Sequence, residues 1–188
     1  MTPKIITPVT SPVIPLAEIR QHLRLDLLGG STHPDDSLIE GYLLAAREYA
    51  EHYTQRSIGA QTLELALDKF PDAGIELPLG AASITSIKYT DTAGDVQTVD
   101  NTEYTLDDYS HTHWAIPVET WPTTAEVANA VKVRYVTPPT FSPAVKTALL
   151  LYVGFMYENR EAVNIGNITS ELPLGVDALL NTARAWQL

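Results

Sequence analysis

The spacing of apolar residues changes twice along the chain, and this change constrains the fold more than any other feature. Residues 35–54 and 143–161 place apolar side chains three or four positions apart, as a helix does. Much of the segment between them, residues 61–136, alternates polar and apolar residues, as a half-buried strand does. We therefore predict an α+β fold with strands between the second and third helices.

The N-terminal part of the chain predicts two helices. Pro15 is suited to the first turn of a helix over residues 16–24. A longer helix over residues 35–54 carries a continuous apolar stripe. Thr32 or Asp35 can cap the N-terminus of this second helix.

Two more helices are expected after the strands. Ser142 as a cap and Pro143 at the first position predict a helix that ends near residue 161. Because this helix is apolar almost all round, it should be covered on most sides and form the axis of the core. A final helix is expected from near Pro173 to Trp186.

Six strands are expected in the alternating segment. In the clearest of them, Val131, Val133 and Tyr135 should face the core while Lys132 and Arg134 face away. The expected strands cover residues 62–68, 84–89, 96–99, 103–106, 114–117 and 130–136.

The resulting domain organisation has an arm and one domain. Residues 1–14 predict an extended, proline-rich N-terminal arm, which either frays or orders against a neighbouring subunit. Residues 15–188 predict a single domain. In it a helical bundle of residues 15–56 and 142–186 carries a small antiparallel β-sheet module, residues 61–136, as an insertion.

The charge and composition exclude several classes of protein. The chain has 188 residues, 23 of them acidic and 12 basic, for a net charge of −11. It therefore lacks the surplus of Lys and Arg that tight, nonspecific DNA binding requires, although an acidic wall would let DNA slide past. We also expect no membrane contact, because the chain has neither a polybasic segment nor an apolar run long enough to span a bilayer. With no cysteine, it can form no disulfide or thiolate metal site, which fits a reducing cytoplasm.

One pair of histidines raises the question of a metal site. His111 and His113 are two positions apart beside Asp107, so a strand would present both imidazoles on one face. A metal-dependent hydrolase that uses these residues is one interpretation, and a polar surface loop is the other. We prefer the surface loop, because the spacing implies no third ligand.

A second polar cluster closes the third helix. Glu158 and Glu161 are three apart and could do acid–base work, but a structural network with Arg160 or another basic group explains them better. The sequence has no phosphate-binding glycine loop and no nucleophile or zinc-protease motif. We predict a non-enzymatic protein with no cofactor.

Several segments near the C-terminus are candidates for partner contacts. Trp186, Gln187 and Leu188 end the chain with apolar surface that is costly to leave in water, so they predict an interface anchor unless Trp186 folds back on its own core. Leu172, beside a loop over residues 163–171, belongs with this set of candidate partner-binding residues, as do Glu158 and Arg160.

A set of short motifs, in this order, resembles the head–tail connector (adaptor) family of tailed bacteriophages. The resemblance covers nearly the whole chain from about residue 13, and its specificity lies in the order and spacing of the motifs. They are LAE (16–18), HLR (22–24), AAREYAE (45–51), YTQR (53–56), IELP (75–78), SIKY (86–89), WP (121–122), VKVRY (131–135), YENREA (157–162), LP (172–173) and LL (179–180).

The resemblance implies a structural protein of the virion neck, assembled in the bacterial cytoplasm. Adaptors of this family form rings, usually of twelve copies, beneath the portal ring, and they join it to a stopper or tail-completion protein while double-stranded DNA passes through. It also implies that the C-terminal segment, with Trp186 and Leu188, reaches into the portal. The proline-rich N-terminus departs from the family pattern. The alternative within the same class is a stopper or tail-completion protein of the neck.

Overall fold

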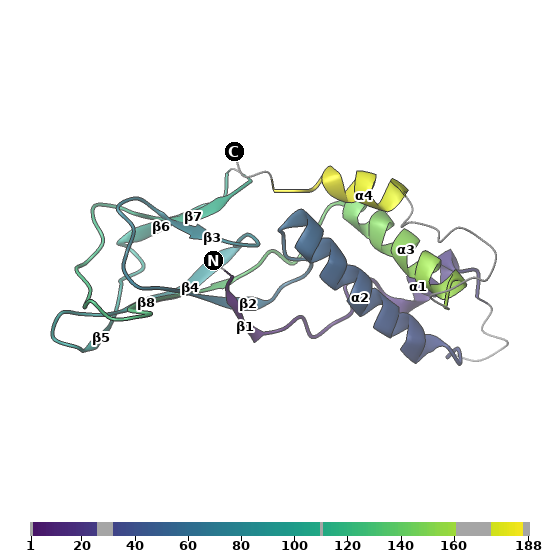
Figure 1. The fold of residues 1–188 in the computed structure, drawn as a ribbon, viewed down its shortest axis with the longest axis horizontal. Coiled ribbons are helices and arrows are strands. Elements are labelled where there is room, and N and C mark those ends of the chain that lie inside the picture. Colours follow the sequence, from purple (N-terminus) through teal and green to yellow (C-terminus); the bar gives the residue numbers. More distant parts are fainter. Residues whose placement is uncertain (1, 26–31, 110, 161–173, 186–188) are drawn as a thin grey trace. The chain divides into compact units, whose positions relative to one another are not determined.

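The computed structural model describes residues 2–25, 32–109, 111–160 and 174–185. The chain forms two compact units (Figure 1). The helical unit comprises residues 10–58 and 141–184, and the β unit comprises residues 1–9, 59–140 and 185–188. The predicted α+β class is therefore confirmed, with a helical part drawn from two distant segments of the sequence.

The described part of the helical unit has four helices, close to the predicted ones. Ser142 caps α3 by accepting a hydrogen bond from the backbone N–H of Val145 at 3.3 Å, and Pro143 stands in the first turn, as predicted. The capping predicted for α2 is wrong for Asp35, which occupies the N-cap position but makes no capping hydrogen bond with its side chain. The helices are α1 (Leu16–His22), α2 (Asp36–Thr54), α3 (Pro143–Glu158) and α4 (Leu174–Asn181).

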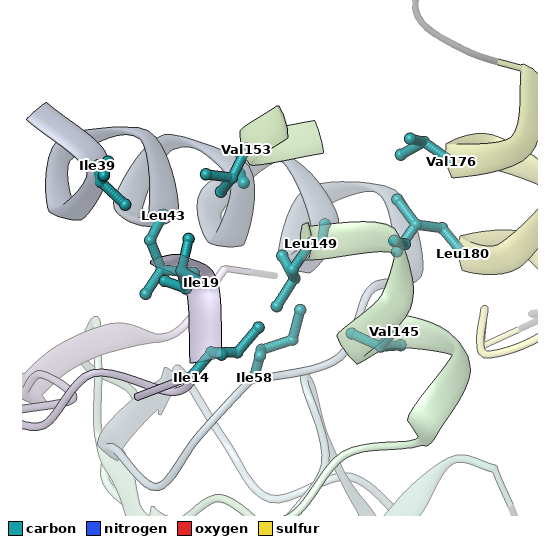
Figure 2. Close-up of a cluster of buried hydrophobic side chains, with 13 residues drawn as sticks. Ile14, Ile19, Ile39, Leu43, Ile58, Val145, Leu149, Val153, Val176 and Leu180 are labelled. Atoms are coloured by element: carbon teal, nitrogen blue, oxygen red, sulfur yellow. The ribbon is translucent and has the colours of Figure 1, made fainter. Parts of the chain in front are cut away.

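One hydrophobic core joins all four helices (Figure 2). Ile19 of α1, Leu43 of α2, Leu149 of α3 and Leu180 of α4 are all buried in it. Each such side chain stabilises the fold by about 1.5–3 kcal/mol when it is fully buried. The described part of the chain buries α3 less completely than predicted, because Leu151 on this helix is 37% exposed.

The described part of the β unit contains two antiparallel sheets, where the sequence predicted one small sheet. One has five strands in the order β1-β2-β8-β4-β5, and the other has three in the order β3-β7-β6. The six predicted strands are present, and β1 and β3 are additional. The strands are β1 (Lys4–Thr7), β2 (Thr62–Leu67), β3 (Ile75–Leu77), β4 (Ser83–Thr90), β5 (Val96–Thr98), β6 (Tyr104–Asp107), β7 (His113–Pro117) and β8 (Val131–Val136).

The position of β1 differs from what the proline-rich N-terminus predicted. Residues 4–7 pair with β2 of the same chain as the edge strand of the five-stranded sheet, with Lys4 opposite Glu64 and Ile5 opposite Leu63. The extended backbone was expected, and within the chain it pairs with β2; an additional contact with a neighbouring subunit stays a prediction.

Side chains from both sheets meet in a second core, separate from that of the helices. Val131, Val133 and Tyr135 of β8 are buried there, while Lys132 is exposed and Arg134 half-buried, as the alternation predicted. The Tyr135 hydroxyl donates a hydrogen bond of 2.8 Å to the carbonyl of Pro78. Across the described ranges, no helix combines the length and the apolar character that crossing a bilayer demands.

Candidate interaction surfaces

The N-terminus of α2 binds α1 through an acidic side chain. Asp36 accepts two hydrogen bonds from the guanidinium of Arg20, one of them from Nε at 2.7 Å, and a third from the backbone N–H of His33 at 2.8 Å. Both side chains are largely buried, with 11% of Arg20 and 17% of Asp36 exposed. A paired arginine and carboxylate in this geometry fixes the direction of α1 relative to α2.

The neighbouring carboxylate connects α2 to the end of α3. Oδ2 of Asp35 accepts hydrogen bonds from the Tyr157 hydroxyl at 2.6 Å and from Nη2 of Arg160 at 2.7 Å, and the Arg160 guanidinium lies 4.5 Å from the centre of the Tyr157 ring. The sequence favoured a structural network in which Glu158 and Glu161 pair with Arg160 or with another basic group. Among the described residues the acid that Arg160 contacts is Asp35, more than a hundred residues away in sequence.

These contacts shift the acidity of the groups involved. The hydrogen bond from Tyr157, followed by that from Arg160, lowers the pKa of Asp35. The hydrogen bond from Arg20 lowers the pKa of Asp36. Both aspartates therefore stay ionised under ordinary conditions, where their charge also suits the positive end of the α2 dipole.

Two further polar contacts connect the helices at other points. The Tyr49 hydroxyl of α2 donates to Oδ1 of Asp177 in α4 at 2.8 Å. Burial, and then this hydrogen bond, raise the pKa of Tyr49 to about 12. Nζ of Lys146 in α3 lies 2.7 Å from Oε1 of Glu18 in α1. Each of α1, α3 and α4 is thus held by a specific polar contact in addition to the apolar core.

The two histidines of the candidate metal site lie in different surroundings. His113 is buried at the start of β7, and its Nδ1 lies 3.0 Å from the backbone nitrogen and 2.8 Å from the carbonyl oxygen of Ala81. His111 is exposed and precedes the strand. Within the described ranges, no three His, Asp or Glu side chains gather closely enough to hold a metal ion. His113 is placed as a structural residue that binds backbone.

The candidate partner-binding residues fall into two groups. Glu158 and Arg160 are exposed at the end of α3, and the Glu158 side chain makes no hydrogen bond or ion pair with a described residue. Leu172, Trp186, Gln187 and Leu188 lie outside the described residues, as does the loop over 163–171.

An open hollow of about 790 Å³ lies on the β unit and was not predicted. Trp121 stacks on Phe70 with the ring centres 4.8 Å apart, and its Nε1 donates to the carbonyl of Ala73 at 2.8 Å. In the sequence, the signal for it is the Trp121-Pro122 pair. The hollow is lined by residues 68–72 and 119–128, four of which are carboxylates. None of these lining residues is a histidine, cysteine or serine.

Comparison with known proteins gives a likeness of fold. No protein-family model matches the chain. No curated protein matches it either. Among solved structures, it is similar over its full length to a chain in the neck of the empty GTA particle, computed with C6 symmetry, with a TM-score of 0.82, 22% identity and 97% of that chain covered.

Two related structures give the same result. A chain of the virion of the native gene transfer agent (GTA) particle matches with a TM-score of 0.80 and 22% identity. A chain of the neck of the native GTA particle, computed with C12 symmetry, matches with a TM-score of 0.77 and 20% identity. In both cases all of this chain and 97% of the other are covered. At this level of identity the likeness establishes the fold, which spans both units.

Proposed function

We propose that this chain is a structural protein of the neck of a tailed-phage-like particle, where it acts as the head-to-tail adaptor. The observation that carries the proposal is the full-length fold likeness to a chain in the neck of a GTA particle. A shared helical core alone would be weak support, since small helical assemblies are common in unrelated proteins. The likeness includes the β unit as well, so it covers a helical unit interrupted by two sheets and not the helices alone.

In this role the chain forms a homo-oligomeric ring, and twelve copies are the number we propose. The C12 and C6 symmetries used for the similar neck structures support a ring of this order. The four helices form the bundle from which each subunit contacts the portal ring on one side and a stopper or tail-completion protein on the other. Double-stranded DNA passes through the ring without specific binding, which the net charge of −11 favours. We place assembly in the host cytoplasm and the finished protein in the virion neck.

The proposed partner contacts involve the end of α3 and four residues nearer the C-terminus that lie outside the described part of the chain. Glu158 and Arg160 are exposed at the end of α3, and Leu172, Trp186, Gln187 and Leu188 complete the proposed set. Arg160 contributes through the face that its contact with Asp35 leaves in solvent, since 46% of its side chain remains exposed. The apolar C-terminal residues supply the anchor to the portal.

The enzymatic alternative has less support. A hydrolase that uses His111 and His113 would need both imidazoles free to bind a metal ion on one side. Nδ1 of His113 is already within hydrogen-bonding distance of Ala81, and the two rings lie in different surroundings. A stopper or tail-completion protein of the same neck remains the second candidate. Such a protein would also lie in the neck, but it would join the particle after the adaptor.

The order of assembly separates these two candidates. The purified chain should bind isolated portal rings directly, and a stopper should bind only after the adaptor is in place. This chain is applied to immobilised portal rings with and without the other neck proteins, the rings are washed, and the retained amount of this chain is measured. Retention on portal rings alone supports the adaptor. Retention that needs another neck protein identifies a stopper instead, and no retention in either case contradicts a place in the neck.

A further inference from the structure

The five strands of the larger sheet have a charge balance opposite to that of the whole chain. They contain four basic residues and one acidic residue, whereas the chain has 12 basic and 23 acidic ones. The four basic residues are Lys4, Lys88, Lys132 and Arg134. Alternation along the strands puts Lys88, Lys132 and Arg134 on the side facing away from the core, because their neighbours Ile87, Val131 and Val133 are buried. Lys4 lies on the same side, because it is opposite Glu64, whose neighbours Leu63 and Leu65 are buried.

This outer surface, here called the basic face, has two lysines directly opposite each other. Lys88 of β4 and Lys132 of β8 are paired in register, and both side chains are exposed. Like charges opposite each other on adjacent strands destabilise a sheet. Neither lysine has an ion-pair partner among the described residues, whereas Arg134 is bound by Glu64 at 2.6 Å. An anionic group of a binding partner would therefore stabilise this pair of lysines.

The basic face is also hollowed where these residues meet. A depression of about 280 Å³ is lined by Lys88, Lys132 and Arg134 together with Ser86 and Val96. Val96 is 71% exposed, so apolar surface lies beside the positive charge. A partner protein surface that carries carboxylates could pair with the lysines and cover the apolar side chain of Val96, and water could not do both.

The three-stranded sheet on the other side of the same core has the opposite character. Its strands contain two acidic residues, Glu76 and Asp107, and no Lys or Arg. Both are paired in register with Trp114 of the middle strand, so the three side chains form one row on the outer surface. Ile116, in the same strand and on the same side, is 38% exposed. We call this surface the acidic face.

We propose that the basic face of one copy binds the acidic face of the next copy, so that the β units of a ring are joined head to tail. The two faces lie on opposite sides of one β unit, and this arrangement lets a chain of identical contacts close into a ring. This inference rests on the proposed function, which supplies the ring, and adds the surfaces that join neighbouring copies.

A second copy is a better occupant of the basic face than DNA. Nonspecific binding of duplex DNA needs a surplus of positive charge, and this chain has a net charge of −11. The β unit alone holds twelve acidic and five basic residues, and its field at a distance repels a polyanion. A carboxylate on a neighbouring subunit interacts with the lysines at contact distance. At that distance the attraction between the paired charges outweighs the screened repulsion from the rest of the unit.

The test uses charge reversal in the full-length chain. A K88E/K132E variant reverses the basic face, an E76K/D107K variant reverses the acidic face, and a fourfold variant combines both. K69E is the control for reversing an exposed lysine outside both faces, because Lys69 lies in the loop after β2. Ring formation is measured by mass photometry on portal rings at about 0.15 M salt, where exposed charges interact over about 8 Å, and thermal melting reports whether each variant folds.

Each reversal of one face should reduce the ring population at least tenfold, and the fourfold variant should recover most of it, while K69E leaves it unchanged. Zero-length Lys–carboxylate crosslinks in a mixture of ¹⁴N- and ¹⁵N-labelled chains should join Lys88 or Lys132 to Glu76 or Asp107 of a different copy. This crosslink keeps the proposal testable if a variant fails to fold.

Rings that tolerate reversal of either face would overturn the proposal and leave the adaptor role intact. A fourfold variant that forms as few rings as each twofold variant would also overturn the proposal and leave the adaptor role intact. A fall in duplex DNA binding with ring formation unchanged would identify nucleic acid as the occupant. A wild-type chain that forms no ring, alone or on portal rings, would contradict the proposed function and this contact together.

Discussion

At the scale of single residues, the polar side chains that form hydrogen bonds between helices stabilise the fold. Asp35 and Asp36 at the start of α2 bind Arg160 and Arg20, and Tyr49 binds Asp177. The sequence could indicate that two adjacent aspartates suit a helix N-terminus. It could not give their partners, because Asp35 and Arg160 are separated by 125 positions and meet only once the helices pack.

The two aspartates predict a dependence of stability on acid. Their pKa values are lowered in the folded chain, so they add stability above the ordinary aspartate pKa of about 3.9 and lose it as the pH falls through their lowered values. The free energy of unfolding, followed by urea titration between pH 6 and pH 2, should therefore decrease below about pH 4. D36N should show a smaller decrease than the wild type. An equal slope in both proteins would mean that the contact with Arg20 does not stabilise the helical unit.

The different surroundings of the two histidines give a second prediction. H113A should reduce the free energy of unfolding by about 1–3 kcal/mol, because it leaves a buried backbone group of Ala81 without its partner. H111A, at an exposed position, should change it by no more than about 0.5 kcal/mol. Chemical denaturation measures both values. Stoichiometric zinc in the purified protein, lost in H113A, would instead support the metal-site interpretation.

At the scale of helices and strands, periodicity predicted the elements well where the burial is one-sided. The alternation in β8 is an example, since its buried and exposed residues are those expected. Two strands were missed for physical reasons. β3 spans three residues, Ile75–Leu77, which is too short for alternation to stand out. β1 lies in a segment rich in proline, and its pairing with β2 depends on a strand some sixty residues away.

The packing of α3 gives a prediction with its control on the same helix. L149A should destabilise the chain by about 2–5 kcal/mol, because Leu149 is 1% exposed within the core that joins the four helices. L151A, two positions on, should cost distinctly less, because Leu151 is 37% exposed. Urea denaturation of both variants measures the difference. Equal losses would show that Leu151 is covered by another part of the chain or by a second copy.

At the scale of the whole molecule, the sequence predicted that helices from both ends of the chain pack together, and all four helices do share one core. It did not predict that the strands form two sheets around a core of their own. Alternation gives the buried face of a strand but not the strand that pairs with it, so one sheet and two sheets have the same pattern. The partner-binding residues stay a prediction, since Leu172, Trp186, Gln187 and Leu188 lie outside the described residues.

Electron microscopy of the purified chain mixed with portal rings tests the central claim most directly. We predict a second closed ring stacked coaxially on the portal, with twelve copies of this chain and an open channel wide enough for duplex DNA. Portal rings that remain bare at saturating concentrations of this chain, under conditions in which other neck proteins assemble, would contradict the adaptor account.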